Sequence, residues 1–213
     1  DAGRTIGIQS SNCGCRCYVA FSNDMEVTKF LGSVSTYVPG KLGGINGRAL
    51  KKGDTISFNS IDTNLIKSSH GALPQYYNSW LIKVTEGPEF KRLSSHTKDN
   101  IENIEYVISN DSNRMGIRLE GPTLEINESG EMISGPVFTG TIQCPGNGLP
   151  ILLGPDAQTL GGYPRIFQVA KVDRFLIGQM RPGDQLKFKR IKIEEAEKLW
   201  LDRVLSFPFL SKI

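Results

Sequence analysis

The segment Arg114–Pro122 carries the most suggestive charged groups in the sequence. Its residues alternate between apolar and charged types, and successive side chains of a strand point to opposite faces. Two guanidinium groups on one face beside Gly116 suit a carboxylate or another planar anion, which arginine binds through two parallel hydrogen bonds. A solvated, salt-bridged outer face of a strand is the alternative. The alternation assigns Met115, Ile117 and Leu119 to one face, and Arg114, Arg118 and Glu120 to the other.

A second group of polar residues lies between Gly140 and Pro164. It offers a carboxylate, amides, a hydroxyl, a phenol and two adjacent glycines, which together supply hydrogen-bonding groups with little steric bulk, as binding loops do. An Asx-type turn is the alternative interpretation of this loop. The residues concerned are Gln143, Asp156, Gln158, Thr159, Gly161, Gly162 and Tyr163.

These two groups lead to one hypothesis for a site. Arg114 and Arg118 would orient a carboxylate-bearing substrate, with Glu120 beside them. Asp156 would accept a proton or a hydrogen bond from an amide N–H. The neighbouring amide, hydroxyl and phenol groups would fix the plane of the substrate. We therefore expect Arg118 and Asp156 to lie near a common pocket, with Asp156, Thr159 and Tyr163 as the catalytic candidates.

Other chemistries find little support in the sequence. The two histidines, His70 and His96, lie in polar, serine-rich segments, which argues against a histidine relay. A phosphate loop of the form GxxxxGK[ST] is absent, and none of the four methionines precedes a lysine, so the sequence has no Met-Lys site for covalent biotin. Cys13, Cys15 and Cys17 alternate along an expected strand, and we expect them to be reduced, small buried residues rather than metal ligands.

The overall composition is that of an ordinary globular protein. The 213 residues contain 25 Lys+Arg and 22 Asp+Glu, a net charge of +3 that is too small for a nucleic-acid interface. The uncharged stretch from Met132 to Pro155 is too rich in glycine and proline for a membrane helix. No signal peptide opens the sequence, so we expect a cytoplasmic protein without membrane or nucleic-acid partners.

Short alternating segments between glycines and prolines predict an all-β, mainly antiparallel protein. We expect an N-terminal partial β-barrel over 1–79, a C-terminal barrel with a terminal helix over 80–213, and closure of the strands of 81–191. Helical turns are expected at Asp24–Leu31 and Thr97–Ile104, and Asn59–Ser79 is the expected connection. The predicted strands are Cys15–Phe21, Thr55–Phe58, Trp80–Val84, Ile104–Ile108, Met115–Glu120, Thr123–Ile126, Val137–Gln143, Ile151–Leu153, Arg165–Ala170 and Asp184–Ile191.

Several motifs together resemble the subunit 2 family of allophanate hydrolase. That family includes part of the carboxyltransferase domain of urea carboxylase and the C subunit of bacterial 5-oxoprolinase. The resemblance spans residues 16–190 and implies cyclophilin-like β-barrels. The matching segments are Leu31–Ser33, Ser35–Tyr37, Gly43–Gly44, Gly47–Leu50, Gly53–Asp54, Asn113–Gly116, Arg118–Pro122, Ser134–Gly135, Gly140–Gln143, Asp156–Thr159, Gly161–Tyr163 and Gln179–Asp184.

One departure from the family lies near the start of the sequence. Asp1–Arg4 resembles the first strand motif of the family, and Arg16–Ala20 resembles a later segment. The resemblance implies a sizeable β-region between the two, which is missing here. We therefore expect either that residues 1–10 are not covalently adjacent to the segment from Ser11 in the intact protein, or that the protein is shortened.

The resemblance implies a subunit of an ATP-dependent 5-oxoprolinase, which opens a lactam ring to give glutamate. The implied partners are a subunit 1 homologue, a hydrolase subunit and a small amide or lactam substrate. ATP is the implied cofactor, at a site shared with the partner subunits, and no covalent biotin is expected. The alternatives are a subunit of a biotin-dependent carboxyltransferase of the urea carboxylase type and a non-catalytic regulator that antagonises a kinase inhibitor.

Overall fold

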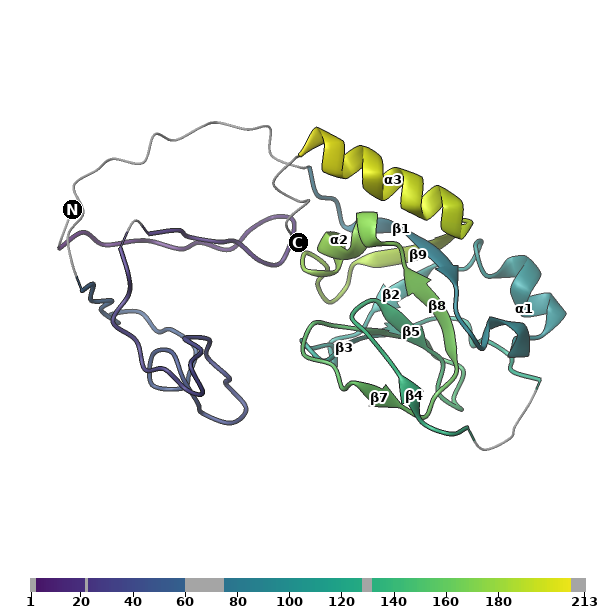
Figure 1. The fold of residues 1–213 in the computed structure, drawn as a ribbon, viewed down its shortest axis with the longest axis horizontal. Helices are drawn as coiled ribbons and strands as arrows, with labels where there is room; N and C mark the ends of the chain where they lie inside the picture. Colours follow the sequence, from purple (N-terminus) through teal and green to yellow (C-terminus); the bar gives the residue numbers. More distant parts are fainter. Residues whose placement is uncertain (1–2, 22, 60–74, 128–131, 208–213) are drawn as a thin grey trace. The chain divides into compact units, whose positions relative to one another are not determined.

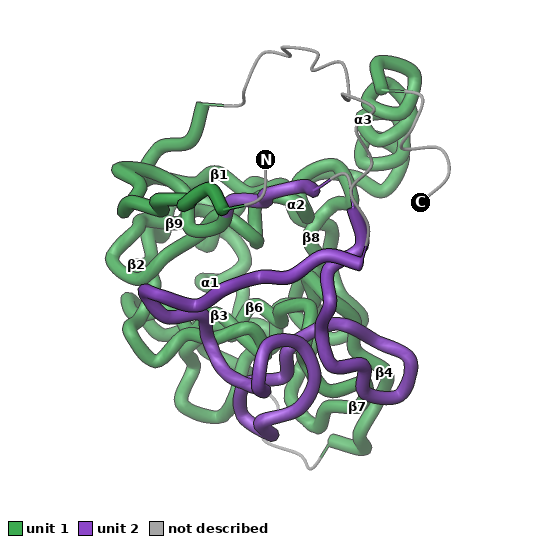
Figure 2. The backbone as a smooth tube through the Cα atoms, turned by 90° about the vertical axis from the view of Figure 1, so that its left-hand side faces the viewer, with its two compact units in different colours: residues 1–16, 74–213 green, residues 17–73 purple. Residues whose placement is uncertain are grey.

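The computed structural model describes residues 3–21, 23–59, 75–127 and 132–207. The chain divides into two compact units, one of residues 1–16 and 74–213 and the other of residues 17–73 (Figure 2). Most of the expected connection Asn59–Ser79 falls at residues 60–74, outside the described ranges.

Seven strands of the larger unit close into a barrel (Figure 1). The closing pair, β1 with β9, is parallel, and the other neighbouring pairs are antiparallel. The predicted all-β fold, with a closed and mainly antiparallel barrel over 81–191, is confirmed. Around the barrel the order is β1 (Ser79–Glu86), β8 (Arg165–Val169), β5 (Thr141–Gln143), β6 (Ile151–Leu153), β3 (Gly116–Glu120), β2 (Tyr106–Ile108) and β9 (Gln185–Arg190).

The alternation of residue types explains why these segments form a barrel. In β1, Trp80, Ile82 and Val84 are buried while the residues between them are exposed or half-buried. In β3, Ile117 and Leu119 are buried in the same way. Because one face of each strand is apolar, the sheet buries that face by curling into a barrel around it.

Aromatic rings fill the centre of the barrel. Tyr106, Phe167 and Phe188 are all buried, and their ring centroids lie 5.8 Å (Tyr106 to Phe188) and 5.6 Å (Phe167 to Phe188) apart. Tilted pairs at such distances add about 0.5–1.5 kcal/mol each beyond the burial of their surface. The barrel is therefore a packed core, and any ligand site must lie on its outer loops.

The helices are short except for the last. Near the expected turn Thr97–Ile104, the Ser94 hydroxyl caps α1 by accepting from the Thr97 N–H at 3.1 Å. The predicted C-terminal helix is confirmed as α3, which packs Ala196 and Leu199 against a small cluster beside the barrel. The helical elements are η1 (Phe90–Arg92), α1 (Ser95–Asn100), η2 (Lys171–Asp173), α2 (Arg174–Ile177) and α3 (Ile193–Ser206).

A small second sheet lies outside the barrel strands. It consists of β4 (Gly135–Pro136) and β7 (Leu160–Gly161), which pair antiparallel. The sequence predicts instead one long strand over Val137–Gln143. Gly140 breaks that strand because its φ of +88° lies in the left-handed region, so only the last three residues join the barrel as β5.

Four predicted elements are wrong. Cys15–Phe21 and Thr55–Phe58 are not strands, and Asp24–Leu31 is not helical. Residues 15–21 form no bridge, and Met25 and Phe58 form only an isolated bridge with each other. Thr123–Ile126 is not a strand either, since only Ile126 forms a bridge there. A strand forms only where a partner strand runs alongside it over several residues, and an alternation of apolar and polar residues does not provide that partner.

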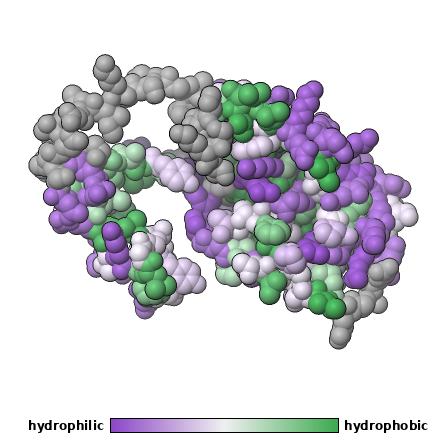
Figure 3. Space-filling model, in the orientation of Figure 1, coloured by the Kyte–Doolittle hydropathy of each residue, from purple (hydrophilic) through white to green (hydrophobic). Residues whose placement is uncertain are grey.

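The surface of the larger unit is mainly polar on the face in Figure 3, with small separate apolar areas. This follows from the alternation, which turns every second strand residue toward solvent. Among the described helices, none combines the length and apolar character that crossing a membrane requires.

Candidate functional site

Arg114 and Asp156 form a two-pronged ion pair next to β3. The Arg114 Nε lies 2.5 Å from Asp156 Oδ2, and Nη2 lies 2.9 Å from Oδ1. The backbone aligns the two residues, because the Asp156 N–H donates to the Arg114 carbonyl at 3.1 Å. Asn113 shapes the turn before β3 by accepting from the Met115 N–H at 2.8 Å. The structure therefore brings together one arginine and the carboxylate of the predicted site.

This pairing defines the chemistry open to Asp156. The hydrogen bonds from Arg114 hold the pKa of the Asp156 carboxyl below its ordinary value, and the charges of Arg114 and Arg16 add to the effect. A carboxylate with a lowered pKa is ionised at neutral pH and is a weaker proton acceptor than an ordinary aspartate. Asp156 is thus better suited to orient Arg114 and the loop than to act as a general base.

Arg118 and Glu120 are exposed on the outer face of β3, opposite the buried Ile117 and Leu119, as the alternation predicts. Within the described residues, neither side chain forms a hydrogen bond or ion pair with the loop that carries Asp156. Met115, predicted on the apolar face, is 51% exposed, because it precedes the strand and lies in the turn.

Gln143 lies at the centre of the second polar group. Its side chain is buried, donates to the Tyr163 carbonyl at 3.2 Å and accepts from the Gln158 amide at 3.4 Å. Gly161 packs directly on it, since a Cβ there would lie 2.5 Å from the Gln143 Nε2. Gly162 is exposed next to this group. The structure thus gathers these predicted residues around one buried amide, while the Tyr163 side chain is half exposed.

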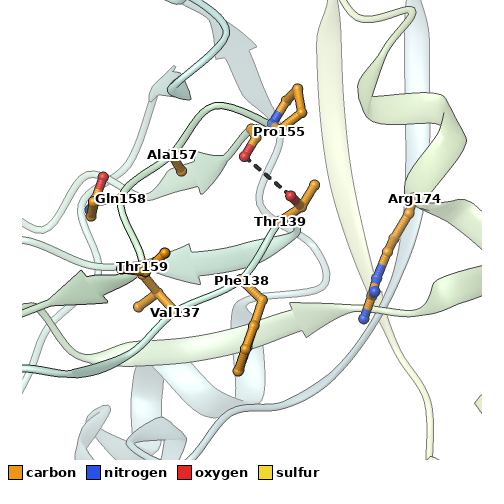
Figure 4. A pocket seen from close by; sticks show the side chains of 9 residues that line it. Val137, Phe138, Thr139, Pro155, Ala157, Gln158, Thr159 and Arg174 are labelled. Atoms are coloured by element: carbon orange, nitrogen blue, oxygen red, sulfur yellow. Dashed lines mark hydrogen bonds between the residues drawn. The ribbon is translucent and has the colours of Figure 1, made fainter. Parts of the chain in front are cut away.

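An open pocket of about 340 Å³ lies beside this group, within the larger unit (Figure 4). It includes the predicted Gln158 and Thr159, while Arg118 and Asp156 do not line it. A common pocket of Arg118 and Asp156 stays a prediction. Its lining residues are Val137, Phe138, Thr139, Gly154, Pro155, Ala157, Gln158, Thr159 and Arg174.

Hydrogen bonds fix the walls of this pocket. The Phe138 N–H donates to the Thr141 hydroxyl at 3.0 Å, and that hydroxyl donates to Gln168 Oε1 at 2.8 Å. The Gln168 amide in turn donates to the Thr139 carbonyl at 3.1 Å. The Thr139 hydroxyl reaches the Gly154 carbonyl at 3.4 Å, shown by the dashed line in Figure 4. The pocket is therefore held in shape without a ligand.

The sequence hypothesis missed the wall Val137–Thr139 and Arg174. A signal for the wall exists in the motif Gly140–Gln143, whose Thr141 anchors it from the adjoining strand. No signal in the sequence points to Arg174. It follows Thr159 by about fifteen residues, and this spacing does not show that the two residues line the same pocket.

The motif Gln179–Asp184 anchors the start of the chain. Gln179 Oε1 accepts from the backbone N–H groups of Cys15 and Arg16, both at 3.1 Å. Arg181 donates to the carbonyls of Ser11, at 3.2 Å, and Asn12, at 2.7 Å. These described bonds give the motif a structural role within the larger unit.

Cysteine and histidine contribute no metal centre to the described part of the chain. No group of three or more His, Cys, Asp or Glu residues there could hold an ion. All four cysteines are free, as expected, but only Cys144 is buried, so the expectation of buried Cys13, Cys15 and Cys17 is wrong. His96 is exposed, and His70 lies outside the described residues.

A sequence profile of the carboxyltransferase domain, subdomains A and B, matches residues 1–190. The chain belongs to this family. Among carboxyltransferase-domain relatives, the C subunit of the Escherichia coli 5-oxoprolinase is 31% identical over 210 residues, which are 99% of this chain and 67% of that protein. The Haemophilus influenzae protein of the same name is 31% identical over 198 residues, 93% of this chain and 63% of that protein.

The chain therefore spans about two thirds of the length of these two carboxyltransferase-family relatives. A solved structure of the family, the urea amidolyase of K. lactis, superposes with a TM-score of 0.74 at 28% identity. That match covers 91% of this chain and 13% of the amidolyase. The resemblance seen in the motifs is thus confirmed, whereas the expected missing β-region near residue 10 stays a prediction.

Proposed function

We propose that this chain is a subunit of an ATP-dependent 5-oxoprolinase, which hydrolyses the lactam bond of 5-oxoproline to give glutamate. The observation that carries the proposal is the 31% identity to the C subunit of the E. coli 5-oxoprolinase over 99% of this chain. In the proposal the chain acts with a subunit 1 homologue and a hydrolase partner subunit. Its free cysteines favour the reducing cytoplasm.

The pocket is the proposed substrate site. Its walls offer neutral hydrogen-bonding groups, the Gln158 amide and the Thr139 and Thr159 hydroxyls, which suit the N–H and C=O of a lactam. Thr159 and Tyr163 are exposed and free to approach a substrate, while Asp156 holds its loop in place through Arg114. ATP would bind at a site shared with the partners, because this sequence has no phosphate loop.

A biotin-dependent carboxyltransferase of the urea carboxylase type is the second candidate. The structural similarity to the K. lactis urea amidolyase favours it. Since no methionine in the sequence precedes a lysine, biotin would have to arrive on a partner.

Reconstitution tests the two candidates together. The purified chain is combined with a subunit 1 homologue and a hydrolase subunit, and supplied with 5-oxoproline, with and without ATP. A parallel mixture supplies urea, free biotin, bicarbonate, ATP and a separate biotin carboxylase that makes carboxybiotin. We expect ATP-dependent release of glutamate from 5-oxoproline that disappears when this chain is omitted. Equal glutamate release without this chain would refute the proposal. Transfer of the carboxyl group from carboxybiotin to urea, with release of biotin, that depends on this chain would favour the second candidate.

A further inference from the structure

Arg174 brings a positive charge to the pocket wall. It begins α2 and is exposed, and its Nε reaches the Val169 carbonyl at 3.5 Å. Among the described residues, its guanidinium has no ion-pair partner. Its terminal nitrogens are therefore available to a ligand in the pocket.

Neither the adjacent Asp173 nor Asp156, beside the pocket, neutralises this charge. Asp173 is buried, and its Oδ2 accepts from the Lys83 backbone N–H at 2.9 Å and lies 3.3 Å from Nζ of the same lysine. Asp156, next to two lining residues of the pocket, is held by both prongs of Arg114. Each of these carboxylates already has its own cation, so Arg174 remains as an anion-binding group.

The rest of the pocket lining is neutral. Arg174 lies on one side, Ala157 and Gln158 lie on the other, and Phe138 and Thr139 lie between them (Figure 4). The guanidinium of Arg174, the ring of Phe138 and the amide of Gln158 thus surround one pocket. A ligand that matches it is a small ring that carries a carboxylate for Arg174, apolar ring carbons for Phe138 and a ring amide that can hydrogen-bond to the wall.

We infer that Arg174 is the carboxylate-binding residue of this pocket, and that the pocket takes a small cyclic amide bearing one carboxylate. The choice of 5-oxoproline as that ligand rests on the proposed function. The pocket volume of about 340 Å³ is near the lower end of the range of about 300–1,000 Å³ typical of ligand pockets. Arg174 thus replaces Arg118 as the group that orients the substrate carboxylate.

The test compares two ligands and two variants of the full chain. Binding of 5-oxoproline and of 2-pyrrolidinone, the same ring without the carboxylate, is followed by chemical-shift titration of the isotope-labelled protein. The variants are Arg174→Gln and, as a matched loss of one exposed positive charge, Lys189→Gln on β9. The dispersion of the spectra reports whether each variant is folded.

We expect wild-type protein and Lys189→Gln to bind 5-oxoproline more tightly than 2-pyrrolidinone. Arg174→Gln should weaken 5-oxoproline binding about 10- to 150-fold, the loss of one charge-assisted interaction, and leave 2-pyrrolidinone binding unchanged. The shifted signals should include Thr139 and Gln158.

Two results would overturn the inference: no binding of 5-oxoproline by the wild-type chain, or equal affinities of the wild type and Arg174→Gln for it. The proposed function is judged separately, by glutamate release from the reconstituted complex. An Arg174-dependent affinity without turnover in that complex would keep the pocket and reject the 5-oxoprolinase activity. Turnover in the complex, together with an unchanged affinity of Arg174→Gln for 5-oxoproline, would keep the 5-oxoprolinase activity and reject the role of Arg174 in the pocket.

Discussion

Replacing Glu89 by glutamine should destabilise the larger unit. The Glu89 carboxylate accepts from Arg165 through Nε at 2.8 Å, Nη2 at 2.6 Å and the backbone N–H at 3.0 Å. The two side chains are only 16% and 18% exposed, so water screens the pair much less than it screens a surface pair. Arg165 also donates to the Pro136 carbonyl at 3.0 Å, which ties β4 and the adjoining pocket wall to the barrel.

The expected loss is about 2 kcal/mol, since glutamine keeps the shape but removes the charge from hydrogen bonds worth about 1.5–3 kcal/mol. For a protein of this size the loss corresponds to a fall in Tm of about 4–8 °C. Urea and thermal unfolding measure both quantities. The matched control is Glu86→Gln, because Glu86 pairs with Arg190 at 3.3 Å and is 56% exposed, so its loss should cost less than about 1 kcal/mol.

The pH dependence of this difference tests the cause. Hydrogen bonds from Arg165 lower the pKa of the Glu89 carboxyl in the folded protein. A group with a lowered folded pKa contributes stability that is present above its unfolded pKa, about 4.3, and is lost as the pH falls through the folded pKa. The gap between the wild type and Glu89→Gln should therefore close in acid. A gap that stayed constant down to about pH 3, or equal losses for both variants, would refute the reasoning.

Three further predictions follow from buried groups. Gly161→Ala should lower the free energy of unfolding in urea by about 1–3 kcal/mol, because its Cβ would displace the buried Gln143. Gly146→Ala is the control and should be neutral, since its Cβ meets open space. Equal effects of the two substitutions would contradict the packing of Gly161 on Gln143. Asp184→Ala should cost about 3 kcal/mol and alter the fluorescence of Trp80, whose Nε1–H donates to the carboxylate at 2.8 Å. Asp184→Asn keeps an oxygen acceptor and should recover part of the loss; no recovery would count against that bond. A thiol reagent should modify the three exposed cysteines of the native protein and spare Cys144, because burial hides the Cys144 thiol and raises its pKa to about 11. Rapid reaction of all four cysteines would count against the burial of Cys144.

The sequence predicts the barrel well because the information it needs is local. Each barrel strand carries its own alternation, and the β6 strand Ile151–Leu153 is found with the predicted bounds. The same alternation misleads at Cys15–Phe21, where Tyr18 is 91% exposed and no continuous partner strand lies alongside in the described residues. Pairing depends on residues distant in the sequence, which a local pattern does not encode.

The candidate site is predictable only in part, for the same reason. The glycines and amides of the loop after β6 indicate close approach, and Gly161 does lie against Gln143. The alternation in β3 correctly places Arg118 on the outer face of the barrel, but it does not show which other residues lie next to that face. Arg174 reaches the pocket through the path of the chain around the barrel, so no spacing between residue types reveals it.

The chemical type of a residue also does not distinguish structure from function in this chain. The motif Gln179–Asp184 combines an amide, an arginine and a carboxylate, the groups expected of a substrate site. Its described bonds run instead to the backbone of residues 11–16, to Asn78 and to Trp80, all within the folded unit. Arg174, by contrast, stands outside any motif, yet its charge has no ion-pair partner in the described part of the chain. A polar group whose hydrogen-bonding capacity is already met by the fold has little left for a ligand, so an unmatched charge at a preformed pocket is the stronger indication of binding.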